Sequence, residues 1–250
     1  SILAQPTTTD PVDPGNKSLI ARRELFKKQP VQMKGRLHSN IFNMNKYMLT
    51  QANIKIKLTR NKPEFYLMGT LDTAFATISN CFLRVRRVRV SPSLMNEHAL
   101  ELEKTNAKYP LKRVVVRNYN VMYSAVRSRI ELHKGVMPNR VVVGFLPTTA
   151  YDGTLASNPF NFPHYDMKEL VLKVSSKAFP YSSGLKFDYA NNRYLQAYNT
   201  LFQGIREAGN DITYEDYKSG YALYAFDLTP DLCSDEHFNI LKDGDLELEI

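Results

Sequence analysis

Alternating apolar and polar residues predict a β-strand near position 56. Ile54, Ile56 and Leu58 occupy every second position, with Lys55 and Lys57 between them. A period of two is typical of a strand that buries one face and leaves the other in water. The same reasoning predicts strands at 32–42, 52–60, 78–90, 111–123, 139–146, 168–175, 221–229 and 245–250.

A helix is predicted directly after the third of these strands. Ser91 is a good N-cap residue, and Pro92 suits the first helical position because its fixed φ matches a helix. Met95, Ala99 and Leu102 then recur at i, i+4 and i+7, which predicts one inward-facing stripe.

A second helix is predicted from about 193 to 207. Gly209 is placed to end it, because glycine readily adopts the backbone conformation that follows a helix. Its predicted apolar stripe consists of Tyr194, Tyr198, Leu201 and Ile205.

Eight short strands suit one jelly roll, a sandwich of two antiparallel sheets. We therefore predict a mainly β protein, a jelly-roll β-sandwich with two helices in its connections, over residues 31–250. Residues 1–30 contain several prolines and a basic cluster, which predicts an arm or linker.

Composition narrows the possible classes of protein. With 250 residues, 43% of them apolar and 23% charged, the chain is suited to a folded core and not to disorder. The net charge of +8 favours acidic partners, nucleic acid among them, but is also compatible with none. Cys81 and Cys233 are too few for a disulfide framework, and neither a membrane span nor a signal peptide is predicted.

Several short sequence motifs then occur in a recognisable order along the chain. They are GRLHSNIF at 35–42, LTRNKPEFYLM at 58–68, FLRVRRVRV at 82–90, KYPL at 108–111, NPFNF at 158–162, YNTLF at 198–202 and YALYAFDLTPDL at 221–232. In this order the chain resembles the C-terminal jelly roll of the double jelly-roll major capsid proteins of Polinton (Maverick) elements and adintoviruses.

The resemblance implies a structural function without catalysis. In that family three subunits form a pseudo-hexagonal capsomer, and capsomers tile an icosahedral shell. The implied partners are further copies of the chain, a second chain supplying the first jelly roll, and a minor capsid or penton protein. The implied location is the virion, with synthesis in the cytoplasm and assembly possible in the nucleus. A domesticated capsid protein that forms virus-like particles, or a lectin-like or receptor-like jelly-roll binding module, remain alternatives.

Four arginines give the predicted strand at 78–90 the strongest charge feature of the chain. Arg84 and Arg86 fall on one face while Arg87 and Arg89 fall on the other, so the alternation changes face between Arg86 and Arg87. A continuous phosphate-binding face is therefore not expected, and nucleic-acid binding should be weak or indirect. We interpret the four arginines as subunit contacts or intrachain ion-pair partners.

The last predicted strand also suggests assembly contacts. Leu246, Leu248 and Ile250 alternate with glutamates. We expect this strand to lack a pairing partner in the chain, exposing backbone groups and these three side chains to another subunit.

No catalytic, cofactor-binding or metal site is predicted. The sequence has no nucleophile elbow, phosphate-binding loop or dinucleotide fingerprint. Carboxylates near 211–216 and 227–236 suit turns better than acid–base chemistry. The five histidines are too far apart for a metal site on one element: His38, His98, His133, His164 and His237.

Overall fold

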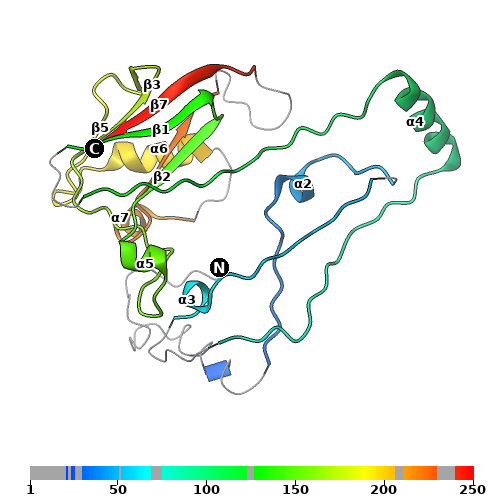
Figure 1. The fold of residues 1–250 in the computed structure, drawn as a ribbon, viewed down its shortest axis with the longest axis horizontal. Helices are drawn as coiled ribbons and strands as arrows, with labels where there is room; N and C mark the ends of the chain where they lie inside the picture. Colours follow the sequence, from blue (N-terminus) through cyan, green and yellow to red (C-terminus); the bar gives the residue numbers. More distant parts are fainter. Residues whose placement is uncertain are drawn as a thin grey trace.

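The computed structural model shows a mainly β protein with antiparallel sheets, as predicted, and a few short helices (Figure 1). Within the described residues, all hydrogen-bonded strands lie after position 128. The structure describes residues 21, 24–25, 30–50, 52–68, 75–122, 127–205, 211–229 and 240–250.

The larger sheet has its last strand near its centre. β7 (Asp243–Glu249) pairs antiparallel with β1 (Arg129–Val136) on one side and with β3 (Glu169–Val174) on the other. The far side of β3 pairs with β4 (Lys177–Phe179) and β5 (Leu185–Lys186). β7 is therefore an interior strand.

The smaller sheet consists of β2 (Arg140–Gly144) and β6 (Leu223–Asp227), again antiparallel. Two strands alone are marginal in water, so this sheet depends on the layer packed against it. That layer is α6 (Leu195–Ile205), which lies against β6. Pairing is nested along the chain, because β1 pairs with β7 and β2 pairs with β6.

One hydrophobic core joins both sheets and their helices. β3 contributes Leu170 and Leu172, and β7 contributes Leu246 and Leu248, all fully buried. Tyr194 and Leu201 lie in the same core, which confirms two members of the predicted helical stripe, while Tyr198 packs at its border. The smaller sheet contributes Tyr224, Ala225 and Phe226 of β6 to this core.

α7 (Tyr214–Lys218) closes the core near α6 and begins with a capping box. The hydroxyl of Thr213 accepts from the backbone N–H of Asp216 at 3.1 Å, while the Asp216 carboxylate accepts from the Thr213 hydroxyl at 2.7 Å. Asp227, at the end of β6, accepts from the backbone N–H of Thr229 at 3.0 Å. The Asp227 carboxylate therefore serves backbone geometry, as predicted, while the Asp216 carboxylate takes part in capping a helix.

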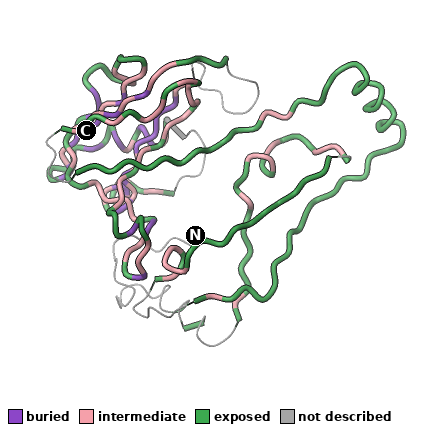
Figure 2. Tube along the Cα trace, viewed as in Figure 1, coloured by how far each residue is buried: buried purple, intermediate pink, exposed green. Residues whose placement is uncertain are grey.

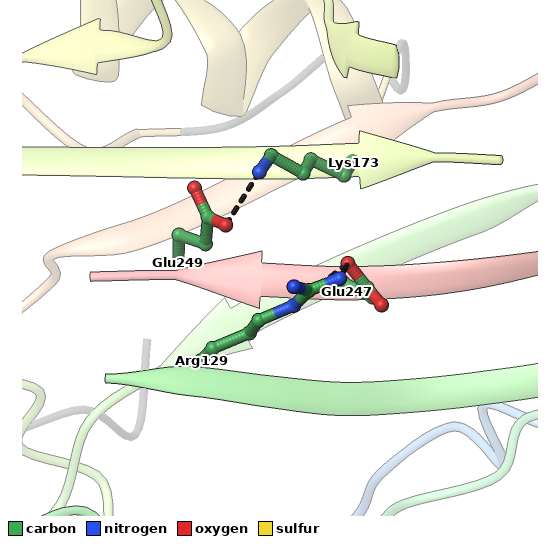
Figure 3. Close-up of polar contacts among 4 residues, drawn as sticks. All are labelled: Arg129, Lys173, Glu247 and Glu249. Carbon is green, nitrogen blue, oxygen red and sulfur yellow. Dashed lines mark hydrogen bonds and ion pairs between the residues drawn. The ribbon is translucent and has the colours of Figure 1, made fainter. Parts of the chain in front are cut away.

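The solvent face of the larger sheet carries charges of alternating sign (Figure 3). Arg129 on β1 binds Glu247 on β7, and Lys173 on β3 binds Glu249 at 2.5 Å. Period-two alternation explains the arrangement, because the glutamates point outward wherever Leu246 and Leu248 point inward. These ion pairs lie on a partly solvent-exposed face of the sheet, where such pairs add little stability.

The remaining helices are short or stand apart from the core. They are α2 (Asn40–Asn43), α3 (Pro63–Tyr66), α4 (Pro92–Lys104) and α5 (Thr148–Asp152). α4 confirms the predicted start, since Ser91 caps it and Pro92 is its first residue. Its predicted inner stripe is wrong, because Met95, Ala99 and Leu102 are all exposed.

Four of the predicted strands are not formed. Segments 32–42, 52–60, 78–90 and 111–122 pair with no strand among the described residues, and α2 begins inside the first of them. Residues 52–60, 77–90 and 111–122 are exposed throughout (Figure 2). Their backbone is extended, but a strand is stabilised only by a neighbour that takes its hydrogen bonds and covers its apolar side.

The expectation for the last strand is also wrong. Leu246 and Leu248 are buried because β7 lies between β1 and β3, which take its backbone hydrogen bonds on both sides. Ile250 packs at the border of the same core, and it exchanges two backbone hydrogen bonds of 3.0 Å with Ser128. These three residues therefore stabilise the fold of their own chain.

Candidate assembly surface

The longest unbroken run of exposed residues in the described part of the chain is 77–108, here called the exposed arm. Every residue of the arm is exposed (Figure 2). The arm contains an extended strand-like segment, then α4, then the start of an extended return (Figure 1). Folded domains rarely leave so long a partly apolar segment uncovered without a partner for it.

The base of the arm is held by three hydrogen bonds. Arg60 donates to the carbonyl of Ala76 at 2.8 Å, just before the arm begins. Tyr109 donates to the carbonyl of Tyr47 at 3.1 Å, just after it ends. Lys46 adds a longer contact of 3.4 Å to the last arm residue, Lys108. The arm is thus fixed at its ends and bare between them.

The arginine-rich segment of the arm shows both faces to solvent. Arg84 stacks over the ring of Phe82, 5.3 Å from its centroid, and thereby covers one side of that ring. Among the described residues none of the four arginines pairs with a carboxylate, so intrachain ion pairs are not their role there. The exposed apolar residues beside them are Phe82, Leu83, Val85, Val88 and Val90.

α4 carries an unburied apolar stripe and an acidic one. Leu94 and Met95 are 41% and 55% exposed, and Leu102, two turns later, is 41% exposed. The acidic residues of α4 outnumber its single lysine, Lys104. They are Glu97, Glu101 and Glu103.

A large open groove of about 2860 Å³ lies in the folded part of the chain, here called the basic groove. The extended segment 111–122 forms one wall, and β1 and β2 form another. Val114 and Val116 of the segment and Val142 of β2 give it apolar surface. Its exposed cations include Arg113, Arg117, Arg127 and Lys168.

Side chains, not a backbone ladder, hold the wall 111–122 in place. The carbonyl of Leu132 in β1 accepts from Arg117 at 3.0 Å and from the hydroxyl of Tyr119 at 2.6 Å. Asn118 donates to the hydroxyl of Tyr151 in α5. β1 therefore pairs with β7 alone among the described residues, and its other edge borders the groove.

The groove has an excess of positive charge. Four carboxylates line it, those of Asp166, Glu169, Asp227 and Glu249, and the last two are paired with cations. Asp227 lies 3.7 Å from Arg140, and the Lys173 ammonium holds the pKa of Glu249 below its usual range. The arginines and lysines that line the groove outnumber these carboxylates, which suits an acidic occupant.

The histidines do not converge on one site. Among the residues that the structure describes, no three His, Cys, Asp or Glu side chains come close enough to hold a metal ion. His164 stacks on Tyr189 at 4.1 Å, where burial lowers its pKa, while His133 contacts the carbonyl of Val136 at 2.7 Å. His38 and His98 are exposed, and His237 lies outside the described residues, as does Cys233.

The residues named from the sequence are separated by the fold. The four arginines lie together in the exposed arm, while the three C-terminal apolar residues lie in or against the core. The arginines that line the groove were missed. A cluster of basic residues between 112 and 117, interleaved with valines, was the available signal for them. The predicted N-terminal arm, 1–30, falls almost entirely outside the described residues.

In the described part of the chain no helix is long and apolar enough to cross a membrane. Comparison with known proteins gives little further constraint. No protein-family model and no solved structure matches the chain. It is similar to an uncharacterized protein of Caenorhabditis elegans, 21% identical over 233 residues. That match covers 88% of this chain and 55% of the nematode protein, so the chain spans about half the length of the relative that it matches.

Proposed function

We propose that this protein is a structural subunit that assembles with copies of itself into a shell. It corresponds to the second jelly roll of a double jelly-roll capsid protein. The exposed arm, residues 77–108, carries this proposal, because it presents strand-like and helical apolar surface that nothing among the described residues covers. A subunit that completes its burial only in an assembly has such a surface.

The order in which β1 to β7 pair supports the jelly-roll assignment. A jelly roll can be described as a long hairpin wound into two sheets, so that early strands pair with late ones. The nested pairs β1 with β7 and β2 with β6 follow this rule. The two sheets also share one core, as the layers of a sandwich do.

The proposed partners follow from the same reading. Identical copies would form a trimeric capsomer and then a lattice, with a penton or minor capsid protein at special positions. A further segment or chain would supply the first jelly roll and pair with the extended segments 32–42 and 52–60. Domesticated use of such particles in a host belongs to the same proposal.

The test is the mass and shape of particles formed by the full chain. Light scattering after size exclusion, together with negative-stain microscopy, should show capsomers or shells far heavier than the 28.7 kDa subunit. Changing Val85 and Val88 of the arm to aspartate should abolish them, while Ile240→Asp, at a still more exposed site outside the arm, should not. A soluble monomer at all concentrations would contradict the proposal.

The basic groove favours one other function, that of a jelly-roll binding module. Such a module would hold an acidic ligand between segment 111–122 and β1 without forming particles. Particle mass separates the two functions, since a binding module remains small when its ligand is absent.

A further inference from the structure

We propose that α4 of one copy binds in the basic groove of a second copy. The exposed arm is then an exchange arm that links subunits. This inference rests on the proposed self-assembly and names the two surfaces that meet. It assigns a partner to each of the two features that the fold of one chain leaves unused, the bare helix and the open groove.

The chemistry of the helix requires a partner. A 13-residue helix is marginal in water without tertiary contacts, and none of the residues of α4 is buried. Its apolar stripe, Leu94, Met95 and Leu102, would be covered in a groove. Its glutamates outnumber its lysines, so the surroundings that it prefers are basic.

The groove offers the complementary chemistry. Val114, which is 86% exposed, and Val142 of β2 would contact the apolar stripe. Arg113 and Arg127 would lie within reach of Glu97 and Glu101. Exposed charge pairs stabilise weakly in salt but determine which surfaces meet, and so the pairing gives specificity more than affinity.

The dimensions agree. A helix of this length is about 20 Å long and about 10 Å across, a cylinder of roughly 1500 Å³. The groove, at about 2860 Å³, is larger than this cylinder, so its volume does not exclude the helix.

Reach favours a second copy as the donor of the helix. In Figure 1, α4 stands at the opposite end of the molecule from β1 and β2, which border the groove. The extended residues 77–90 span roughly 45 Å, well beyond the roughly 14 Å radius of gyration of a compact unit of about 120 residues. The arm is therefore long enough to cross to a neighbour.

Charge reversal on each surface tests the pairing in the full-length protein. The helix-reversed variant carries Glu97→Arg and Glu101→Arg, and the groove-reversed variant carries Arg113→Glu and Arg127→Glu. The matched control carries Lys177→Glu and Lys242→Glu, exposed residues outside both surfaces, with the same charge change as the groove reversal. Circular dichroism verifies that all variants are folded.

Each reversed variant alone should assemble at least 10-fold more weakly by sedimentation, while the control should assemble like the unchanged chain. Mixing the two reversed variants should restore assembly, because each then offers a surface that fits the other. Docking of α4 into the groove of its own chain predicts no such rescue.

Three results would overturn the inference. Undiminished assembly of both reversed variants would refute it while leaving the proposed function intact. Loss without rescue on mixing would exclude exchange between copies. Groove reversal that abolishes retention of duplex DNA but leaves assembly unchanged would assign the groove to nucleic acid. An unchanged chain that never assembles would instead refute the proposed function itself.

Discussion

The hydroxyl groups of Tyr189 and Tyr224 lie 2.8 Å apart and form a hydrogen bond inside the core. Tyr189 precedes α6 and Tyr224 lies on β6, so this bond joins the helical side of the core to the smaller sheet. Burial raises the pKa of Tyr189 to about 12 and raises that of Tyr224 as well. Both groups are thus neutral at physiological pH, and each satisfies the other.

The costs of removing the two hydroxyls should therefore not be additive. We expect Tyr224→Phe to lower the free energy of unfolding by about 1–3 kcal/mol, because it leaves the Tyr189 hydroxyl buried without this partner. The double change Tyr189→Phe with Tyr224→Phe should cost less than the sum of the single changes. Urea denaturation measures both, with the exposed Tyr181→Phe as control. Strict additivity would contradict the coupling.

Stability should fall as pH falls from about 6.5, because burial lowers the pKa of His164 below its usual value. The unfolded chain then binds the proton more tightly than the folded one, so protonation favours unfolding. In addition, the Nδ1 atom accepts from the backbone N–H of Asp166 at 2.9 Å, which requires that nitrogen to be unprotonated. The Asp166 carboxylate, 3.4 Å away, opposes the shift only in part.

The measurement is the urea midpoint between pH 7.5 and pH 5. His164→Phe keeps an aromatic ring against Tyr189 and should flatten the pH dependence. His98→Phe, in the exposed arm, should leave it unchanged. Equal slopes in all three proteins would exclude His164 as the group responsible.

Leu248 should behave as a core residue. It is only 2% exposed, so we expect Leu248→Ala to cost about 2–5 kcal/mol through lost burial and the cavity that remains. Leu241→Ala, at a leucine that is 79% exposed, is the matched control and should change stability little. Thermal and urea unfolding would reveal the difference. A Leu248→Ala variant with unchanged stability would mean that β7 is not an interior strand.

Duplex DNA should bind the arginine-rich segment weakly. Arg87 and Arg89 point to the opposite face from Arg84 and Arg86 if the segment is extended, so few phosphates can be met together. We expect binding to vanish with modest salt and to change less than threefold in the Arg87→Ala, Arg89→Ala variant. Fluorescence anisotropy with labelled duplex measures this, and tight salt-resistant binding lost in that variant would reverse the assignment.

The pattern of apolar residues predicted four of the strands that form and missed β1, β4 and β5. The predictions at 139–146, 168–175, 221–229 and 245–250 contain β2, β3, β6 and β7. The pattern at 52–60 is just as regular, yet no strand forms there, because pairing is a property of two segments and the pattern describes only one.

β1 is a strand that forms although the sequence pattern did not predict it. Ile130 and Leu132 alternate, but the register with β7 shifts between Glu131 and His133, and this irregularity breaks the pattern of two. The basic groove was equally hard to foresee. Its wall at 111–122 is attached to β1 by long-range side-chain bonds to Leu132, which leave no local trace in the sequence.

The central position of β7 has a consequence for synthesis of the protein. Arg129 pairs with Glu249, so the first strand of the larger sheet must wait until the roughly 120 residues between them have been translated. At about 5–20 residues per second this delay is roughly 6–24 s on the ribosome. During that time Leu170 and Leu172 have no β7 to cover them, and β1 and β3 cannot touch through it. The larger sheet can therefore be completed only after β7 has emerged from the ribosome.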